Sequence, residues 1–531
     1  MVVFVCANVW NPGSAKDVNS TFAKANQGKY SQQMRSGIVK TLLSFLLVAF
    51  APLSWAQKVP TTDDSAALAN AHRLFRQADF RGAAAAFRKI VDAKPSADAY
   101  AGLVRSLLKA DDVKAAEESS QKALAGFPDS AVIHAERGDV YYRRGFIPQA
   151  EDEYRAAFKL DDKCARAWLG QGKVDAVYTR HSKAKAAVAK AHELDPQDSD
   201  AFYEWAIRLA YPENVAALER HLAEFHNDPE AERHEREYKD FVKALAGRKT
   251  WIPARDVERA EIKMEALTVG AHFVLRGYGL RVRLNDRATV TLLVDTGSSG
   301  ITITRKLAEK IGASKLSEQA LEGVGKSGAA VGYKAWVDKV VIGDLEFHDC
   351  FVQATPREIA EVDGIIGMDV FSKYLVTLDM PVRKLRLEQM PARSNESEPA
   401  QTEAFSQTFT LGHFLLLPTE VGKKATGLFV VDSGSNANTI SPELARLMPE
   451  MRAFNSPMSG ASGVVNSAFI ADDATLRFAK VNRSDRISTL DLHLVSKDLG
   501  IEVSGQIGFS AMENMKVTID YRDGLVQFVG K

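Results

Sequence analysis

A phrase that occurs twice in the second half of the chain constrains the fold more than any other feature. Residues 292–299 read Leu-Leu-Val-Asp-Thr-Gly-Ser-Ser, and residues 429–436 read Phe-Val-Val-Asp-Ser-Gly-Ser-Asn. Each phrase is an apolar run followed by Asp and Gly, which is typical of a buried strand that ends in a turn. One phrase alone would indicate only a turn. Two copies indicate a repeated structural unit.

The residues around the two aspartates, Asp295 and Asp432, are repeated as well. An isoleucine follows each aspartate after eight residues, a leucine after twelve and a glycine after 28. Farther on, residues 364–367 (Gly-Ile-Ile-Gly) correspond to residues 505–508 (Gly-Gln-Ile-Gly). Gln506 therefore makes this segment less apolar in the second copy. We infer that each aspartate belongs to one copy of a duplicated unit.

Each copy resembles one lobe of a retropepsin-like aspartic protease. The resemblance rests on the apolar-Asp-Thr/Ser-Gly-Ser phrase, the glycine-rich segment after it and the later apolar-apolar-Gly segment. It implies an all-β, two-lobed retropepsin/pepsin-like acid protease domain, with both lobes in one chain and each lobe of the smaller retropepsin size. The first lobe is expected at residues 266–390, a polar linker at 391–404 and the second lobe at 405–531.

The resemblance assigns catalysis to Asp295 and Asp432. Two carboxyl groups about 3 Å apart share one proton, because both cannot ionise together. The charged group then acts as general base on water, and the protonated group acts as general acid. This chemistry requires no metal and no cofactor. The sequence contains no His-Glu-x-x-His or Cys-x-x-Cys motif that would suggest a metal site.

The residues that follow each aspartate are expected to support it. The glycines let the backbone approach the carboxylates and donate N–H groups, and the serines place a hydroxyl donor near each carboxylate. Such donors favour the charged form, so we expect an acidic to mildly acidic optimum. The resemblance also implies that the Thr and Ser hydroxyls after the aspartates tie the lobes together. These supporting residues are Thr296, Gly297, Ser298, Ser433, Gly434 and Ser435.

A glycine-rich segment lies beyond the aspartate in each copy. By resemblance it is a flap that closes over substrate and excludes water. The alternative is an ordinary hairpin turn, which also favours glycine. The candidate flap residues are Gly323, Val324, Gly325, Gly460, Ala461 and Gly463.

The first half of the chain repeats with a period of 33 or 34 residues. Residues 65–247 are rich in Ala, Leu, Glu, Lys and Arg, with apolar residues at helical spacing. The period resembles that of tetratricopeptide repeats, in which antiparallel helix pairs stack into an all-α solenoid. Such arrays bind peptide or protein on their concave face, or they only space or dimerise domains. The period is marked by Pro95, Pro128, Asp162, Pro196 and Pro229, and a small residue recurs at Ala83, Ala116, Ala150, Ala184 and Ala217.

Residues 34–56 have the order of a secretory signal peptide. Positive charges precede the apolar run TLLSFLLVAFAPL, and Ser-Trp-Ala stands before an expected cut at Gln57. The preceding residues 1–33 are expected to come from a misplaced start, with Met34 as the initiator. An uncleaved anchor is the alternative, although the run is shorter than the roughly 20 residues of a membrane span. We therefore expect export to the periplasm or secretion, with no stable membrane span after cleavage.

Charge excludes one class of partner. Lys and Arg (68) balance Asp and Glu (68), so nucleic-acid binding is not expected. Residues 248–265 are expected to connect the helical and β regions. We predict an aspartic endopeptidase whose helical repeats recruit a protein partner or substrate. The alternative is a catalytically inactive scaffold of the retropepsin fold that binds peptides, and a pure adaptor would explain the paired aspartates poorly.

Overall fold

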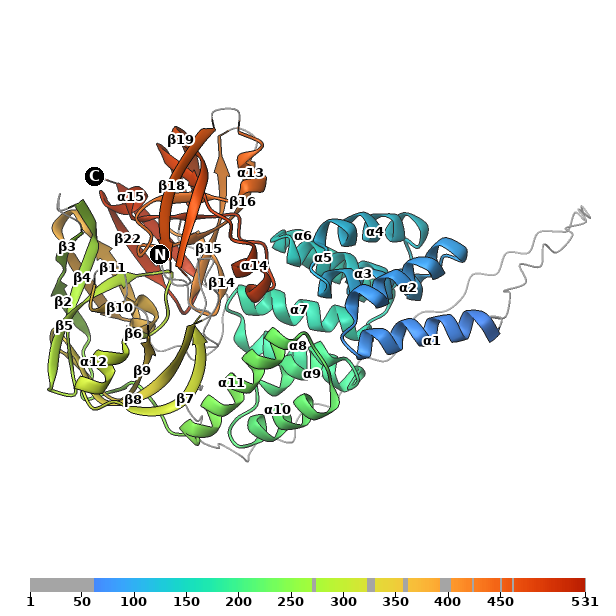
Figure 1. The fold of residues 1–531 in the computed structure, drawn as a ribbon, viewed down its shortest axis with the longest axis horizontal. Helices are drawn as coiled ribbons and strands as arrows, with labels where there is room; N and C mark the ends of the chain where they lie inside the picture. The colour runs from blue at the N-terminus through green and yellow to red at the C-terminus, as the bar shows by residue number, and fades with distance from the viewer. Residues whose placement is uncertain are drawn as a thin grey trace, which may run out of the picture.

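The computed structural model consists of a helical array followed by a β-rich domain of two lobes (Figure 1). The predicted fold class, an all-α helical-repeat solenoid followed by an all-β two-lobed domain, is confirmed. The segments expected as a mis-started N-terminus and a signal peptide, 1–33 and 34–56, lie outside the described residues. The structure describes residues 62–269, 274–321, 330–356, 362–391, 403–422, 425–448, 451–460 and 463–530.

Consecutive helices of the array pack against each other along the chain. Short polar side chains fix several of the reversals, because Asp79, Ser96 and Asp112 accept a hydrogen bond from the first turn of the helix that follows. The helices are α1 (Thr62–Arg76), α2 (Phe80–Ala93), α3 (Ala97–Lys109), α4 (Val113–Gly126), α5 (Ala131–Arg143), α6 (Ile147–Leu160), α7 (Ala165–Val177), α8 (His181–Leu194), α9 (Ser199–Ala206), α10 (Glu213–Glu224) and α11 (Pro229–Leu245).

The repeated small residue explains how closely the helices pack. The alanine predicted in every second helix is buried in all five repeats. A Cβ at Gly138 would lie 2.5 Å from the ring of Tyr154, so this glycine lets α5 approach α6. Ser120 and His221, four residues after Ala116 and Ala217, are polar, yet both are buried. Polar neighbours satisfy them: Ser120 accepts a hydrogen bond from Arg137 at 2.8 Å, and His221 bonds to Glu235 at 2.8 Å.

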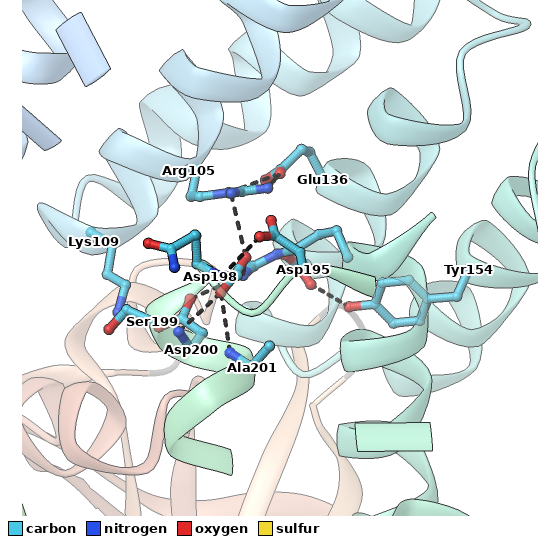
Figure 2. A network of polar contacts seen from close by, with 12 residues as sticks. Arg105, Lys109, Glu136, Tyr154, Asp195, Asp198, Ser199, Asp200 and Ala201 are labelled. Atoms are coloured by element: carbon cyan, nitrogen blue, oxygen red, sulfur yellow. Dashed lines mark hydrogen bonds and ion pairs between the residues drawn. The ribbon is translucent and has the colours of Figure 1, made fainter. Parts of the chain in front are cut away.

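A network of ion pairs joins helices that are far apart along the array (Figure 2). Arg105 on α3 bonds to Glu136 on α5 at 2.6 Å and lies 3.5 Å from Asp198, the cap of α9. Lys109 on α3 reaches Asp200 on α9 at 2.6 Å. The array therefore curves enough to bring its second and fifth repeats into contact.

The first lobe is a nine-stranded sheet that carries Asp295 at the end of its central strand. The strand order is β1-β9-β6-β10-β5-β4-β8-β7, and β3 pairs with β4. A short helix, α12 (Arg305–Lys310), follows β6. The strands are β1 (Ile252–Pro253), β3 (Glu265–Val269), β4 (Val274–Leu284), β5 (Ala288–Asp295), β6 (Ile301–Thr304), β7 (Ser314–Leu321), β8 (Ala330–Ile342), β9 (Leu345–Thr355) and β10 (Gly364–Gly367).

The second lobe repeats this topology. Its eight strands are ordered β14-β15-β16-β21-β17-β20-β19-β18. In both lobes the later glycine segment pairs in parallel with the strand that leads to the aspartate: β10 with β5 and β21 with β16. The elements are β14 (Phe409–Leu411), β15 (Phe414–Val421), β16 (Ala425–Val431), β17 (Asn438–Ile440), α13 (Pro442–Ala445), β18 (Arg452–Gly460), β19 (Gly463–Phe478), β20 (Val481–Thr489), α14 (His493–Leu499), β21 (Gly505–Ile507) and α15 (Phe509–Met512).

A six-stranded sheet joins the lobes, in the order β13-β23-β22-β11-β12-β2. Its central strands come from equivalent places in the two copies, and Thr377 pairs with Thr518 with their hydroxyls 3.1 Å apart. The lobes are thus related by an approximate twofold axis. The segment 248–265, expected as a connection, contributes β1 and β2 to the sheets. The strands are β2 (Arg259–Lys263), β11 (Tyr374–Asp379), β12 (Lys384–Gln389), β13 (Ser406–Gln407), β22 (Met515–Asp520) and β23 (Leu525–Gly530).

The helical array packs on the second lobe rather than standing apart from it. Apolar side chains of α5–α7 and of β14–β16 form one buried cluster. Tyr178 meets Phe409 edge to face at 5.5 Å, and Leu428 fills the space beside Gly145. Arg144 adds an ion pair to Glu502 at 2.9 Å. The array is therefore part of the structural support of the second lobe.

Candidate active site

The topology places the two predicted aspartates at equivalent strand ends. Asp295 is the last residue of β5 and pairs with Gly367 of β10. Asp432 follows β16, and its N–H donates to the carbonyl of Ile507 in β21 at 2.9 Å. Both side chains are buried, with exposed fractions of 1% and 0%. Each aspartate is therefore held by two strands of its own lobe.

The two turns face each other across the axis. A Cβ at Gly297 would lie 2.7 Å from the carboxyl carbon of Asp432, and a Cβ at Gly434 would overlap the carboxyl group of Asp295. Only glycine allows this approach. The carboxyl groups of Asp295 and Asp432 share a hydrogen bond. The structure thus brings the two predicted residues into one site.

Two donors hold each carboxyl group. Asp295 accepts the N–H of Gly297 at 2.8 Å and the hydroxyl of Ser298 at 2.7 Å. Asp432 accepts the N–H of Ser435 at 2.9 Å and the side-chain amide of Gln506 at 2.9 Å.

The expectation that both serine hydroxyls serve the aspartates is wrong for the second lobe. The hydroxyl of Ser435 donates to the carbonyl of Ala437 at 2.9 Å. Its backbone N–H bonds to Asp432, where the first lobe uses the N–H of Gly297. In the second lobe the turn directs the N–H of Ser435 at the carboxylate, so the hydroxyl of Ser435 points to its own loop instead.

Gln506 supplies the side-chain donor to Asp432 that the Ser435 hydroxyl does not provide. Its Nε2 donates to Asp432, and its Oε1 accepts the hydroxyl of Thr439 at 2.9 Å. At the matched position of the first lobe, Ile365 pairs with Thr302. The hydroxyl of Thr302 is buried there without a hydrogen-bond partner among the described residues. The sequence shows Gln506 as a departure from the first copy, but only the structure shows that it contacts the aspartate.

Thr296 and Ser433 tie the lobes together as the resemblance implies. The Thr296 hydroxyl donates to the carbonyl of Val431 at 2.8 Å and accepts the N–H of Ser433 at 2.9 Å. The Ser433 hydroxyl donates to the carbonyl of Val294 at 3.0 Å and accepts the N–H of Thr296 at 3.1 Å. These four buried bonds cross between lobes and fix the separation of the aspartates.

Burial dominates the electrostatics of the pair. It raises the pKa of Asp432 well above its ordinary value, and the nearby charge of Asp295 and their shared hydrogen bond raise it further. Burial also raises the pKa of Asp295, although its bonds from Ser298 and Gly297 oppose this. The pair therefore keeps one proton over a range of pH in which isolated aspartates are ionised.

The candidate flap residues fall on hairpins where the structure describes them. Gly460 ends β18 and pairs with Gly463, the first residue of β19. In the first lobe, β7 and β8 form the corresponding hairpin, with Leu321 paired to Ala330. Four of the predicted residues lie outside the described chain: Gly323, Val324, Gly325 and Ala461.

The described residues contain no group of three or more His, Cys, Asp or Glu side chains placed to hold a metal ion. The paired carboxyl groups of Asp295 and Asp432 can perform acid–base chemistry. One proton on a pair of carboxyl groups leaves one group able to accept a proton and the other able to donate one.

Comparisons with known proteins agree with this reading of the two regions. Residues 280–370 match the family model for aspartyl protease, and residues 68–131 and 136–201 match a model for tetratricopeptide repeat. The predicted recognition of a retropepsin-like aspartic protease domain preceded by tetratricopeptide repeats is therefore confirmed.

Two solved structures are similar to parts of the chain. The aspartic proteinase of Irpex lacteus is 13% identical with a TM-score of 0.35, and the match covers 51% of this chain and 97% of that one. A thermophilic TPR protein of Thermus thermophilus is 21% identical with a TM-score of 0.26, and the match covers 30% of this chain and 91% of that one. A comparison with curated protein sequences found no match.

Proposed function

We propose that this protein is an aspartic endopeptidase that hydrolyses peptide bonds with a water molecule activated by Asp295 and Asp432. One observation carries the proposal: two buried carboxyl groups from opposite lobes each lie against the catalytic turn of the other lobe, and each receives two donors. Such a pair holds a single proton without a metal ion.

The pair performs both proton transfers of the reaction. The ionised carboxylate takes a proton from water while the water oxygen attacks the peptide carbonyl carbon. The protonated carboxyl group gives its proton to the carbonyl oxygen, which forms a neutral tetrahedral intermediate. A proton then passes to the peptide nitrogen as the C–N bond breaks. Because the groups titrate together, the roles of base and acid belong to the pair.

The helical array is proposed to recruit a protein partner or substrate next to the second lobe. Its contribution is also architectural, which the buried cluster shared with β14–β16 favours. The basic side chains of the network in Figure 2 are already paired: Arg105 with Glu136, and Lys109 with Asp200. Recruitment therefore relies on other groups of the array, since these cations are neutralised within the chain.

We also propose that the protein is exported to the periplasm or secreted. The support is the sequence of residues 34–56, and N-terminal sequencing of the protein from its host would test it by locating the cut at Gln57. Among the described residues, no helix combines the length and apolar character needed to span a membrane.

Cleavage of a mixed peptide library by residues 57–531 from about pH 3 to pH 8 tests the catalytic proposal. We expect acid-optimal cleavage that disappears in both Asp295→Asn and Asp432→Asn. The matched control is Asp344→Asn, because Asp344 is exposed in the turn after β8. Folded wild-type protein that binds peptides but cleaves none would instead establish the inactive scaffold.

A further inference from the structure

Two nitrogen-bearing side chains occupy equivalent positions beside the aspartate pair. Arg276 precedes Asp295 by 19 residues, and His413 precedes Asp432 by 19 residues. The strand registers agree, because Gly279 pairs with Leu293 and Leu416 pairs with Val430. The approximate twofold axis therefore relates Arg276 to His413.

His413 shows what this position faces. Its Nε2 lies 3.3 Å from the carbonyl oxygen of Gly297, in the catalytic turn of the opposite lobe. Strand β4 of the first lobe also passes the opposite turn, since a Cβ at Gly277, the residue after Arg276, would lie 3.9 Å from the carbonyl oxygen of Ser433. The backbone of Arg276 is adjacent to this contact, and the charges of Asp295 and Asp432 act on its guanidinium.

The two side chains differ in charge. Burial lowers the pKa of His413 to about 4, so the imidazole is neutral above that pH. Arg276 keeps its charge, because a guanidinium remains protonated even where burial lowers its pKa. The second lobe therefore presents a neutral ring where the first lobe presents a cation.

The Arg276 cation has no local counter-ion. Its side chain is 8% exposed, and within the described ranges no carboxylate lies at ion-pair distance and Nη1 has no hydrogen-bond partner. The charges that act on it are those of Asp295 and Asp432. The two aspartates share one negative charge, and four donors other than Arg276 already bond to their carboxyl groups. An unpaired buried guanidinium is costly, so a ligand carboxylate that reached it would bind strongly.

We propose that Arg276 binds a carboxylate of the substrate, so that the preferred substrates are peptides with an acidic group close to the scissile bond. This inference rests on the proposed function, because it concerns the same aspartate pair. The guanidinium offers paired N–H donors that match a carboxylate. The equivalent His413 offers no charge, so the preference applies to one side of the scissile bond.

Matched peptides test the proposal. Each peptide identified in the library is made with Glu or Gln at every position near the scissile bond, and with a free or amidated C-terminus. At about pH 6, where a substrate Glu is ionised and His413 is neutral, we expect a Glu-over-Gln ratio in kcat/KM of about tenfold or more at one position. If only the free C-terminus raises kcat/KM, the carboxylate that Arg276 binds is the C-terminal carboxylate of the peptide. Equal rates for all pairs would overturn the proposal.

Variants at the two equivalent positions identify the residue responsible. Arg276→Gln should reduce the ratio to about one, Arg276→Lys should retain part of it, and His413→Gln should leave it intact. A ratio unchanged in Arg276→Gln would also overturn the proposal. If Arg276→Gln fails to fold, the Glu-over-Gln ratio of Arg276→Lys tests the proposal. A reduced ratio would support it, and an unchanged ratio would overturn it.

A binding measurement separates this inference from the catalytic proposal. Asp295→Asn cannot hydrolyse peptides if the pair is catalytic, yet it retains Arg276. Isothermal titration of this variant with the Glu and Gln peptides should give the same preference in Kd. If the wild-type protein cleaves nothing, the catalytic proposal fails. A Glu preference in Kd would still support carboxylate binding by Arg276. Equal Kd values for the Glu and Gln peptides would refute carboxylate binding by Arg276.

Discussion

Replacing Gln506 by Met removes one donor from Asp432 and the acceptor of the buried Thr439 hydroxyl. Methionine has nearly the same volume and length, so the packing around β21 should be retained. The lost bond is 2.9 Å long and lies between a glutamine that is 1% exposed and an aspartate that is 0% exposed. A hydrogen bond to a charged group contributes about 1.5–3 kcal/mol, so its loss shifts the pKa of the pair by about 1–2 units.

The sign of the shift follows from the donor. Gln506 bonds to the carboxylate and favours its charged form, so its removal raises the pKa of the pair. The acid limb of the kcat/KM profile should therefore move to higher pH by about 1–2 units. Below that limb, the rate should fall by about one to two orders of magnitude relative to wild type.

The pH profile of peptide cleavage measures this shift, and the duplicated lobe provides a matched control. Ile365→Met changes the equivalent position of the first lobe, where no side-chain donor reaches Asp295 from β10 in the described chain. It should leave the acid limb in place. A folded Gln506→Met protein with an unshifted limb, or an equal shift in Ile365→Met, would refute the reasoning.

Three further predictions concern stability. Thr296→Val leaves the N–H of Ser433 and the carbonyl of Val431 without their buried partner. The substitution should lower the free energy of unfolding, measured by urea titration, by about 2–4 kcal/mol. An unchanged midpoint of the urea titration would contradict this. Asp432→Asn should raise the melting temperature at pH 7 but not at pH 3. The pKa of Asp432 is raised, so its carboxyl group binds the proton more tightly in the native state than in the unfolded state. The contribution of Asp432 to stability therefore falls as pH rises above the ordinary value of 3.8. An equal rise in melting temperature at both pH values would count against burial as the cause of the raised pKa. A chain of residues 248–531 should aggregate, because it exposes Leu428 and the rest of the second lobe's apolar surface, and a soluble monomer by size-exclusion chromatography would show that the array is dispensable.

Much of the site could be predicted because its signals are local. An apolar strand that ends in Asp-Thr/Ser-Gly determines its own turn, and a second copy in the same chain indicates that two such turns meet. The 33- or 34-residue period likewise predicts where small residues must be buried, and Ala83 and Ala150 are fully buried.

The two regions, the duplication and the pairing of Asp295 with Asp432 therefore follow from patterns within the sequence. The folded arrangement alone shows which donors complete the pair: Gln506 bonds to Asp432, and the Ser435 hydroxyl does not. It also decided that Arg276 lacks a counter-ion within the described chain and that the array packs on the second lobe. The physical reason is that strand and helix patterns arise from neighbouring residues. The partner of a buried polar group, in contrast, depends on rotamers and contacts between segments far apart in the chain.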